Sequence, residues 1–258
     1  MRSIARAENA QQSRRYVEVE EGAAWVQDYF GRMGAVAFNG GKPPEQGMPC
    51  PQAFLVEQQP KQVADPHFHL IDQFQVVVGG GGLMGKRPIH GIAVHYANAY
   101  TTYGPLAAGP DGIHYITMRN RWDTTLAHFM PKCRGELKSE PRRHLLIDPV
   151  TPATLEQLAD MASPVFQSLH EADDDGLAVW RYRIPAGQAV DGPDPADGAG
   201  QYWLVLAGEL SVGDQKLTPM SCLFLDAEEA PLELAGGSGG VEMLGLQFPT
   251  RDQGQNRA

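Results

Sequence analysis

The sequence predicts an all-β protein made of two tandem β-domains that are joined by a short helical linker. Three observations support this fold class: the frequency of turn residues, the distribution of strand-forming runs, and an internal repeat. The chain of 258 residues contains 29 glycines and 20 prolines, which favours many short elements separated by turns.

Runs rich in β-branched and aromatic residues, bounded by Gly, Pro, Asp or Asn, predict strands in both halves of the chain. They are 53–59, 73–78, 91–97 and 113–119 in the first half, and 177–184, 202–207 and 241–248 in the second. Many short strands with frequent turn signals are typical of β-sandwiches and β-barrels.

The repeat relates the two halves when Gln73 is aligned with Gln201. Segment 73-QFQVVVGGGGLMGKRPIHGIAV-94 then matches 201-QYWLVLAGELSVGDQKLTPMSC-222 without a gap. The coinciding residues also include Gly80 with Gly208, and Gly85 with Gly213. Segments 104–118 and 230–246 correspond in the same order, with two extra residues in the second copy. We therefore expect a duplicated β-unit.

Between the copies, 151-TPATLEQLADMAS-163 predicts a helix. Thr151 is suited to the N-cap, Pro152 to the first turn, and Pro164 marks the end. The expected organisation is an N-terminal barrel over 1–130, a linker with this helix over 131–170, and a C-terminal barrel over 171–250.

Composition excludes several classes of function. Residues 1–150 carry a net charge of +2 and residues 151–258 one of −12, which disfavours binding to nucleic acid or anionic lipid. We expect neither a membrane-spanning segment nor a signal peptide, because no run of about 18 apolar residues occurs and residues 1–16 have no apolar core. Cys50, Cys133 and Cys222 are far apart and lack a CxxC pattern, which argues against disulfides and cysteine-based metal sites and fits a cytoplasmic protein.

The candidate site is the stretch 67-HFHLIDQFQVVVGG-80. Two histidines at i and i+2 of a strand point to the same face and can bind one cation. The stretch resembles the first motif of the cupin superfamily, HxHx(3)Ex(6)G: His67, His69 and Gly80 match, and Gln73 stands where the family has glutamate. The resemblance covers both halves, as in a bicupin. It implies jelly-roll (double-stranded β-helix) barrels, one divalent metal, and frequently a homo-oligomer.

The sequence also departs from the family. Gln73 lacks the charge of glutamate, and the second cupin motif is replaced by 100-YTTYGPLAAG-109. His95, His114 or the phenol of Tyr103 could supply the missing contact. In the second copy, Pro195 and Asp197 occupy the positions of the histidines, so we expect any chemistry in the N-terminal barrel.

Two further motifs have competing interpretations. The run 80-GGGLMGK-86 fits the start of a nucleotide-binding loop, but Arg87 replaces the required Ser or Thr, so we interpret the glycines as a hairpin turn. Arg119 and Arg121 are either anion-binding groups or a solvated strand end.

The sequence and the resemblance together favour a metal-dependent, dioxygenase-like enzyme that acts on a small organic substrate. The expected metal ligands are His67, His69, Gln73 and His114; iron is favoured, with Zn, Mn or Ni as alternatives. Tyr103 and His95 are candidate acid/base groups, and Arg119 is the candidate substrate-binding residue. A non-catalytic ligand-binding or sensing module and a purely structural cupin remain as alternatives.

Overall fold

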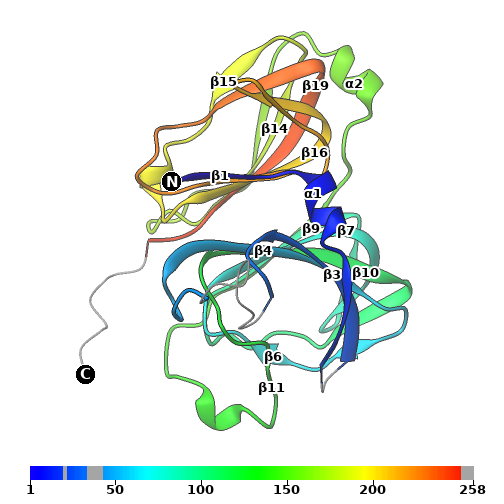
Figure 1. The fold of residues 1–258 in the computed structure, drawn as a ribbon, viewed down its shortest axis with the longest axis vertical. Coiled ribbons are helices and arrows are strands. Elements are labelled where there is room, and N and C mark those ends of the chain that lie inside the picture. Colours follow the sequence, from blue (N-terminus) through cyan, green and yellow to red (C-terminus); the bar gives the residue numbers. More distant parts are fainter. Residues whose placement is uncertain (20–21, 34–42, 251–258) are drawn as a thin grey trace. The chain divides into compact units, whose positions relative to one another are not determined.

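The computed structural model describes residues 1–19, 22–33 and 43–250. The chain divides into two compact units: Asn9–Thr151 forms one, and Met1–Glu8 together with the chain from Pro152 onward forms the other. Both consist mainly of antiparallel strands (Figure 1), so the predicted all-β class is confirmed. This division differs from the expected boundaries, because the first eight residues join the C-terminal unit.

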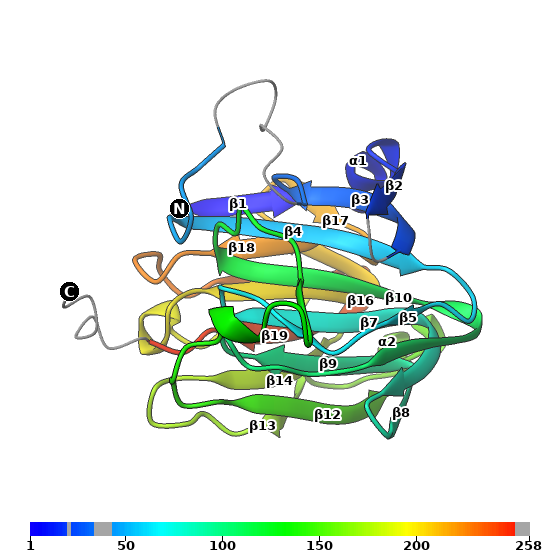
Figure 2. The ribbon, with the colours of Figure 1, turned by 90° about the horizontal axis from the view of Figure 1, so that it is seen from below.

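The unit Asn9–Thr151 contains a nine-stranded sheet and a small two-stranded sheet. The large sheet has the order β12-β9-β7-β10-β4-β3-β2, with β5 on β10 and β8 on β7; β6 pairs with β11. Figure 2 shows β3, β4, β10, β7, β9 and β12 following one another across the view. The strands are β2 (Arg15–Val19), β3 (Gly22–Phe30), β4 (Pro49–Gln58), β5 (Val63–Ala64), β6 (His67–Phe68), β7 (Gln73–Met84), β8 (Arg87–His90), β9 (Ile92–Ala97), β10 (Leu106–Arg121), β11 (His128–Phe129) and β12 (His144–Val150).

The second unit contains an eight-stranded sheet of order β1-β18-β16-β19-β14-β13, with β15 on β19 and β17 on β16. Its strands are β1 (Arg2–Ala5), β13 (Val165–His170), β14 (Ala178–Ile184), β15 (Ala189–Asp191), β16 (Gln201–Val212), β17 (Gln215–Leu217), β18 (Cys222–Leu225) and β19 (Glu233–Gln247). The order β18-β16-β19-β14 repeats β9-β7-β10-β4, and β7 and β16 begin at the aligned glutamines Gln73 and Gln201. Alternating apolar side chains fill each core, including Val77 and Ile113 in one unit and Val205 and Val241 in the other.

The two copies share an irregularity of strand pairing, at Gly80 in the first and at Gly208 in the second. Both have positive φ, +65° and +72°, and both lie where the strand pairing shifts register. A Cβ on Gly80 would lie 2.2 Å from the carbonyl oxygen of Gly112, and one on Gly208 would lie 2.1 Å from that of Gly240. Both glycines therefore stand at an irregularity of strand pairing, β7 with β10 and β16 with β19, where the partner strand comes too close for a side chain. The hairpin expected in the run 80–86 is present, but its turn is formed by Gly85 and Lys86, whereas 79–82 continue β7, which pairs with β8 up to Met84 and Arg87.

The helices differ from the expectation as well. The predicted helix over 151–163 is only Leu155–Ala159 (α2), and its N-cap is Thr154, which forms a capping box with Gln157. The reciprocal side-chain bonds of Thr154 satisfy the first amides, so the helix starts later than Pro152 indicated. A second short helix, α1 (Ala7–Gln12), was not predicted. The range 131–170 is no simple linker, because it also contains β12 and β13.

Among the described residues, no helix has the length and apolar character that crossing a membrane requires.

Candidate functional site

A cavity of about 150 Å³ lies inside the unit Asn9–Thr151. Its apolar wall comes largely from β3, β4 and the segment before β11. The polar groups that line it include both histidines of the HxH pair. The wall includes Val26, Met33, Phe54, Val56, Leu126, Ala127 and Phe129, together with His67, His69, Gln75, Thr117, Arg119 and Thr125.

Strand β10 delivers its alternate side chains to this cavity. Tyr115, Thr117 and Arg119 line it, as expected for residues two apart on one face of a strand. His114 occupies the other face, where it packs against Gly79 and lies near Glu57. Its prediction as a metal ligand is therefore wrong, because the pleat of β10 points its side chain away from the cavity.

His67 and Tyr103 are the first two members of a buried hydrogen-bond chain. Nδ1 of His67 lies 2.7 Å from the Asp65 carbonyl oxygen and must donate to it. Nε2 is then an acceptor, and it lies 3.0 Å from the Tyr103 hydroxyl. The hydroxyl donates to His67 and accepts from Nε2 of Gln73 at 2.7 Å. The NH2 group of the Gln73 side chain therefore points at the Tyr103 hydroxyl.

The other end of Gln73 is bound by Arg119. Oε1 of Gln73 accepts from Nε and Nη2 of Arg119 at 3.2 and 2.9 Å. Nη2 also lies 3.0 Å from Nδ1 of His69, and Nη1 donates to Gln52 at 3.0 Å. Arg119 is only 2% exposed, so the expectation of a solvated strand end is wrong. The positive charge of Arg119 therefore lies beside His69 and Gln73, two of the predicted metal ligands.

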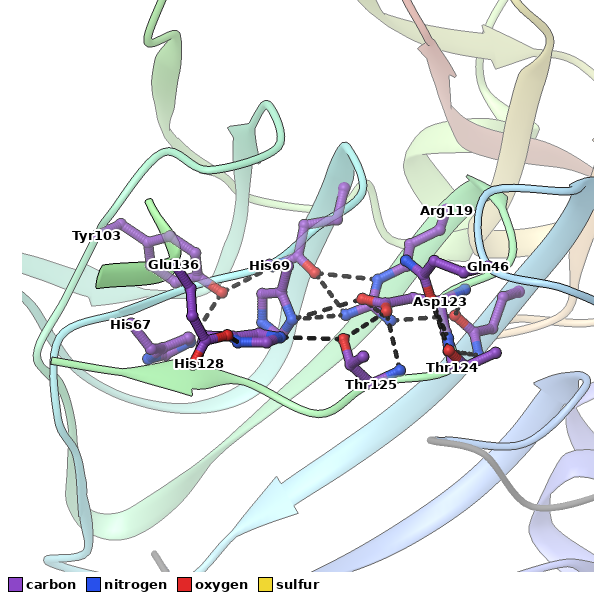
Figure 3. Close-up of polar contacts among 12 residues, drawn as sticks. Gln46, His67, His69, Tyr103, Arg119, Asp123, Thr124, Thr125, His128 and Glu136 are labelled. Atoms are coloured by element: carbon purple, nitrogen blue, oxygen red, sulfur yellow. Dashed lines mark hydrogen bonds and ion pairs between the residues drawn. The ribbon is translucent and has the colours of Figure 1, made fainter. Parts of the chain in front are cut away.

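Asp123 supplies the counter-charge to this buried guanidinium. Its Oδ2 lies 3.2 Å from Nη1 of Arg119, and its Oδ1 accepts from the amide and hydroxyl of Thr125 at 3.0 and 2.6 Å. Figure 3 shows His69 between the His67–Tyr103 pair on one side and Arg119 with Asp123 on the other. The guanidinium has protein partners at all three nitrogens, which leaves Arg119 as an internal cation rather than an open anion-binding group.

The buried histidines and the tyrosine of the chain are neutral near pH 7. Burial lowers the pKa of His67 to about 4, with the positive charge of Arg119 acting in the same direction and the Asp65 carbonyl opposing it. Burial and then Arg119 lower the pKa of His69 well below 6.5. Burial raises the pKa of Tyr103 above its ordinary value of 10. The guanidinium of Arg119, which lies against Asp123, is therefore the cation of this network.

His95 lies next to Tyr103 but does not line the cavity. Its ring centroid is 4.6 Å from that of Tyr103, and its Nδ1 bonds to Oε1 of Gln75 at 2.9 Å. The remaining nitrogen, Nε2, is buried and has no hydrogen-bond partner among the described residues. Burial, and then the neighbouring His144, lower the pKa of His95. The structure thus places both candidate acid/base residues, Tyr103 and His95, behind the HxH pair.

The predicted set of metal ligands does not fit a divalent cation as it is bonded here. Since Arg119 only donates, Nδ1 of His69 must accept, which places the proton of the neutral ring on Nε2. The coordinating oxygen of Gln73 is bound by the same guanidinium, and its amide hydrogens face Tyr103. The ligand atoms available to a metal are therefore uncharged, most of them already make hydrogen bonds, and the positive charge of Arg119 lies beside them. These ligands would offset little of the free energy that a divalent cation loses on leaving water.

In the second unit, the positions that align with Gln73 and Arg119 both hold uncharged residues. Gln201 and Gln247 align with Gln73 and Arg119, and Nε2 of Gln201 donates to Oε1 of Gln247 at 2.8 Å. An amide–amide bond therefore replaces the amide–guanidinium contact. Pro195 and Asp197, at the positions of the histidines, lie in a short 3₁₀ helix.

Several residues of the network were missed in the sequence. Gln52 and Asp123 come from β4 and from the segment after β10, and the cavity wall comes from β3 and β4. The period of two along β10 was the available signal, because it places Thr117 and Arg119 on one face and His114 on the other. The missing charge at Gln73 was a second signal, because Asp123 already supplies the counter-charge to Arg119 and position 73 needs only a neutral acceptor.

Known structures resemble this chain over most of its length. A proposed dioxygenase from Nostoc punctiforme has a TM-score of 0.63 at 12% identity and covers 100% of this chain and 85% of its own. The pirin of Escherichia coli in complex with nickel(II) has a TM-score of 0.55 at 11% identity, covering 97% and 100%. Salicylate 1,2-dioxygenase from Pseudaminobacter salicylatoxidans has a TM-score of 0.50 at 12% identity, covering 78% and 71%.

No protein-family model and no curated protein matches the sequence. The structural neighbours are cupin-fold proteins, so the predicted jelly-roll fold is confirmed.

Proposed function

We propose that the unit Asn9–Thr151 binds a small organic molecule in the cavity beside His67 and His69. The composition of the cavity wall carries this proposal. Apolar side chains such as Phe54 and Phe129 supply a surface for a hydrocarbon body, and the HxH pair brings polar atoms to the same space. A mostly apolar cavity with a few placed polar groups is the usual form of a small-ligand site.

The polar atom best placed to select the ligand is Nε2 of His69. The bond from Arg119 to Nδ1 holds the ring as the Nε2–H tautomer, and no described residue accepts from Nε2. Burial keeps the ring neutral, so Nε2–H acts as a hydrogen-bond donor. The proposed ligand therefore has an apolar body and one strong acceptor, such as a carbonyl, carboxylate or phenolate oxygen.

Isothermal titration of chelator-treated protein tests this proposal. The probes are small aromatic and aliphatic acids, phenols and ketones, and they include salicylate because the Pseudaminobacter neighbour is named for it. Thr117→Leu fills the cavity, whereas His114→Leu changes the opposite face of the same strand and serves as the matched control. We expect Thr117→Leu to weaken binding at least about tenfold and His114→Leu to leave it unchanged.

Two results would overturn the proposal. One is the absence of binding across the whole panel; the other is equal binding by the Thr117→Leu and His114→Leu variants.

A second candidate is a metal-dependent oxygenase, and the likeness to the Nostoc and Pseudaminobacter proteins favours it. It needs a redox-active metal, and the hydrogen bonds of His69 and Gln73 to Arg119 do not fit one at the HxH pair. Oxygen uptake by iron-loaded protein in the presence of the same probes tests it. Ligand-dependent uptake that is lost in Thr117→Leu supports this candidate, and binding without uptake supports a non-catalytic module.

A further inference from the structure

We infer that His128, Cys133 and Glu136 form a binding site for one divalent transition metal with the ligand preferences of zinc. The site is separate from the HxH pair. One donor atom from each residue, a ring nitrogen, the thiol sulfur and a carboxylate oxygen, lies within 4.8 Å of the other two. This inference does not depend on the proposed ligand in the cavity.

The local backbone brings the three side chains together. His128 lies on β11, which pairs with β6, so that His128 stands opposite Phe68. Beyond it the chain turns tightly, with the amide of Cys133 bonded to the Phe129 carbonyl at 2.9 Å and the 3₁₀ helix Arg134–Glu136 following. Residues at i and i+3 of a 3₁₀ turn lie one above the other, which places Cys133 and Glu136 on the same side.

His128 is held in an orientation that suits a ligand. Its ring stacks on Phe68 with centroids 5.1 Å apart, and Nε2 lies 3.3 Å from the hydroxyl oxygen of Thr125. Nδ1 points at the Glu136 carboxylate, with 2.7 Å between Nδ1 and Oε2. Metal-binding histidines usually use one ring nitrogen for the metal and the other for a hydrogen bond that fixes the ring. Thr125 supplies that second contact here.

The donor spacing is close to what a tetrahedral ion requires. Ligand bonds of roughly 2.0–2.3 Å at tetrahedral angles set donor atoms roughly 3.4–3.6 Å apart. The present separations start at 2.7 Å and stay within 4.8 Å, so side-chain rotations suffice. Glu136 is 54% exposed and can move without disturbing the core. Imidazole, thiolate and carboxylate together favour Zn²⁺ among common divalent ions, and three protein ligands leave one position open.

The charge of this site contrasts with that of the HxH pair. A thiolate and a carboxylate offset the two positive charges of the ion, whereas His67, His69 and Gln73 offer no negative charge and lie beside Arg119. The absence of a CxxC pattern hid this site in the sequence, because only one ligand is a cysteine. The turn adjoins the cavity, since Thr125 and Phe129 line its wall.

Titration of the full-length, untagged, chelator-treated protein with Co²⁺ tests the inference without any organic ligand present. Cobalt is the probe because a thiolate ligand gives a sulfur-to-metal charge-transfer absorption. We expect one equivalent to bind with this absorption and Zn²⁺ to displace it. Cys133→Ser should abolish the absorption, and Glu136→Gln, at an exposed position, should weaken binding more than about tenfold.

Cys50→Ser is the matched cysteine control, and His67→Gln is the control for the HxH pair. Both should bind Co²⁺ as the unchanged protein does. The inference is overturned if the protein binds no stoichiometric Co²⁺, if the thiolate absorption persists in Cys133→Ser, or if His67→Gln removes it. Because ligand binding is measured with the metal stripped, failure of this site and failure of the proposed ligand site are separate results.

Discussion

Replacing Arg119 by methionine should be one of the most destabilising single changes in the unit Asn9–Thr151. Methionine retains much of the side-chain length but removes the charge and every donor. The carboxylate of Asp123 is fully buried, and its Oδ2 makes no hydrogen bond among the described residues. The positive charge of Arg119, 3.2 Å away, is therefore the main interaction that stabilises the negative charge of Asp123. Loss of one partner of a buried ion pair costs about 3–5 kcal/mol.

A double-mutant cycle with Asp123→Asn assigns this effect to the ion pair. Asparagine removes the charge while keeping an oxygen for the two bonds from Thr125. The combined variant should therefore recover part of the loss, with a coupling energy of about 1–3 kcal/mol. Urea unfolding should be followed by hydrogen exchange of peptides from β7 and β10, with peptides from β16 and β19 as the internal control, because the chain has two units.

The reasoning is refuted if Arg119→Met costs less than about 1 kcal/mol, or if its effect and that of Asp123→Asn simply add. Either result would mean that water or relaxation compensates Asp123, and the guanidinium would not be an essential internal cation.

Three further changes test other parts of the structure. The buried His67 has a pKa of about 4, against 6.5 for a free histidine, so between these pH values the unfolded chain binds a proton that the folded chain does not. The free energy of unfolding should therefore fall by roughly 3 kcal/mol as pH drops from 6.5 to 4 and stay constant below pH 4. Urea unfolding midpoints of the unchanged protein and of His67→Gln, compared across this pH range, measure the effect. Gly80→Ala should lower thermal stability by at least about 2 kcal/mol more than Gly85→Ala, because only the first places a Cβ 2.2 Å from a backbone oxygen although both have positive φ. Gln73→Glu combined with Arg119→Met exchanges the internal cation for a carboxylate, and Ni²⁺ titration should show metal binding at the HxH pair that neither single change produces.

Each of these has a clear contrary result. If the stability of His67→Gln depends on pH in the same way as that of the unchanged protein, His67 is not the titrating group. Equal losses for the two glycine variants would show that the backbone of β10 moves away from position 80 at little cost. Metal binding at the pair in the unmodified protein would show that Arg119 moves aside easily.

Cytoplasmic localisation and homo-oligomer formation, both expected from the sequence, stay predictions.

The sequence determined the features that depend on local pattern. Alternating β-branched and aromatic runs give strands, so β4, β7 and β10 lie where 53–59, 73–78 and 113–119 predicted them. The internal repeat determined that the two units share a strand order, and it aligned Gly80 with Gly208, whose positive φ both strands require. The HxH pair was also visible, because its members are two residues apart in the chain.

Only the tertiary structure decided what the pair contacts. Arg119 is 46 residues from Gln73 in the chain, and the register of β10 on β7 brings them together. The same register turns His114 away, and the pairing of β11 with β6 brings His128 beside the HxH strand. A local pattern fixes which face a side chain takes relative to its own strand, but its partners depend on how distant strands pair. That is why the sequence predicted histidines at a cavity and the structure supplied the buried cation against them.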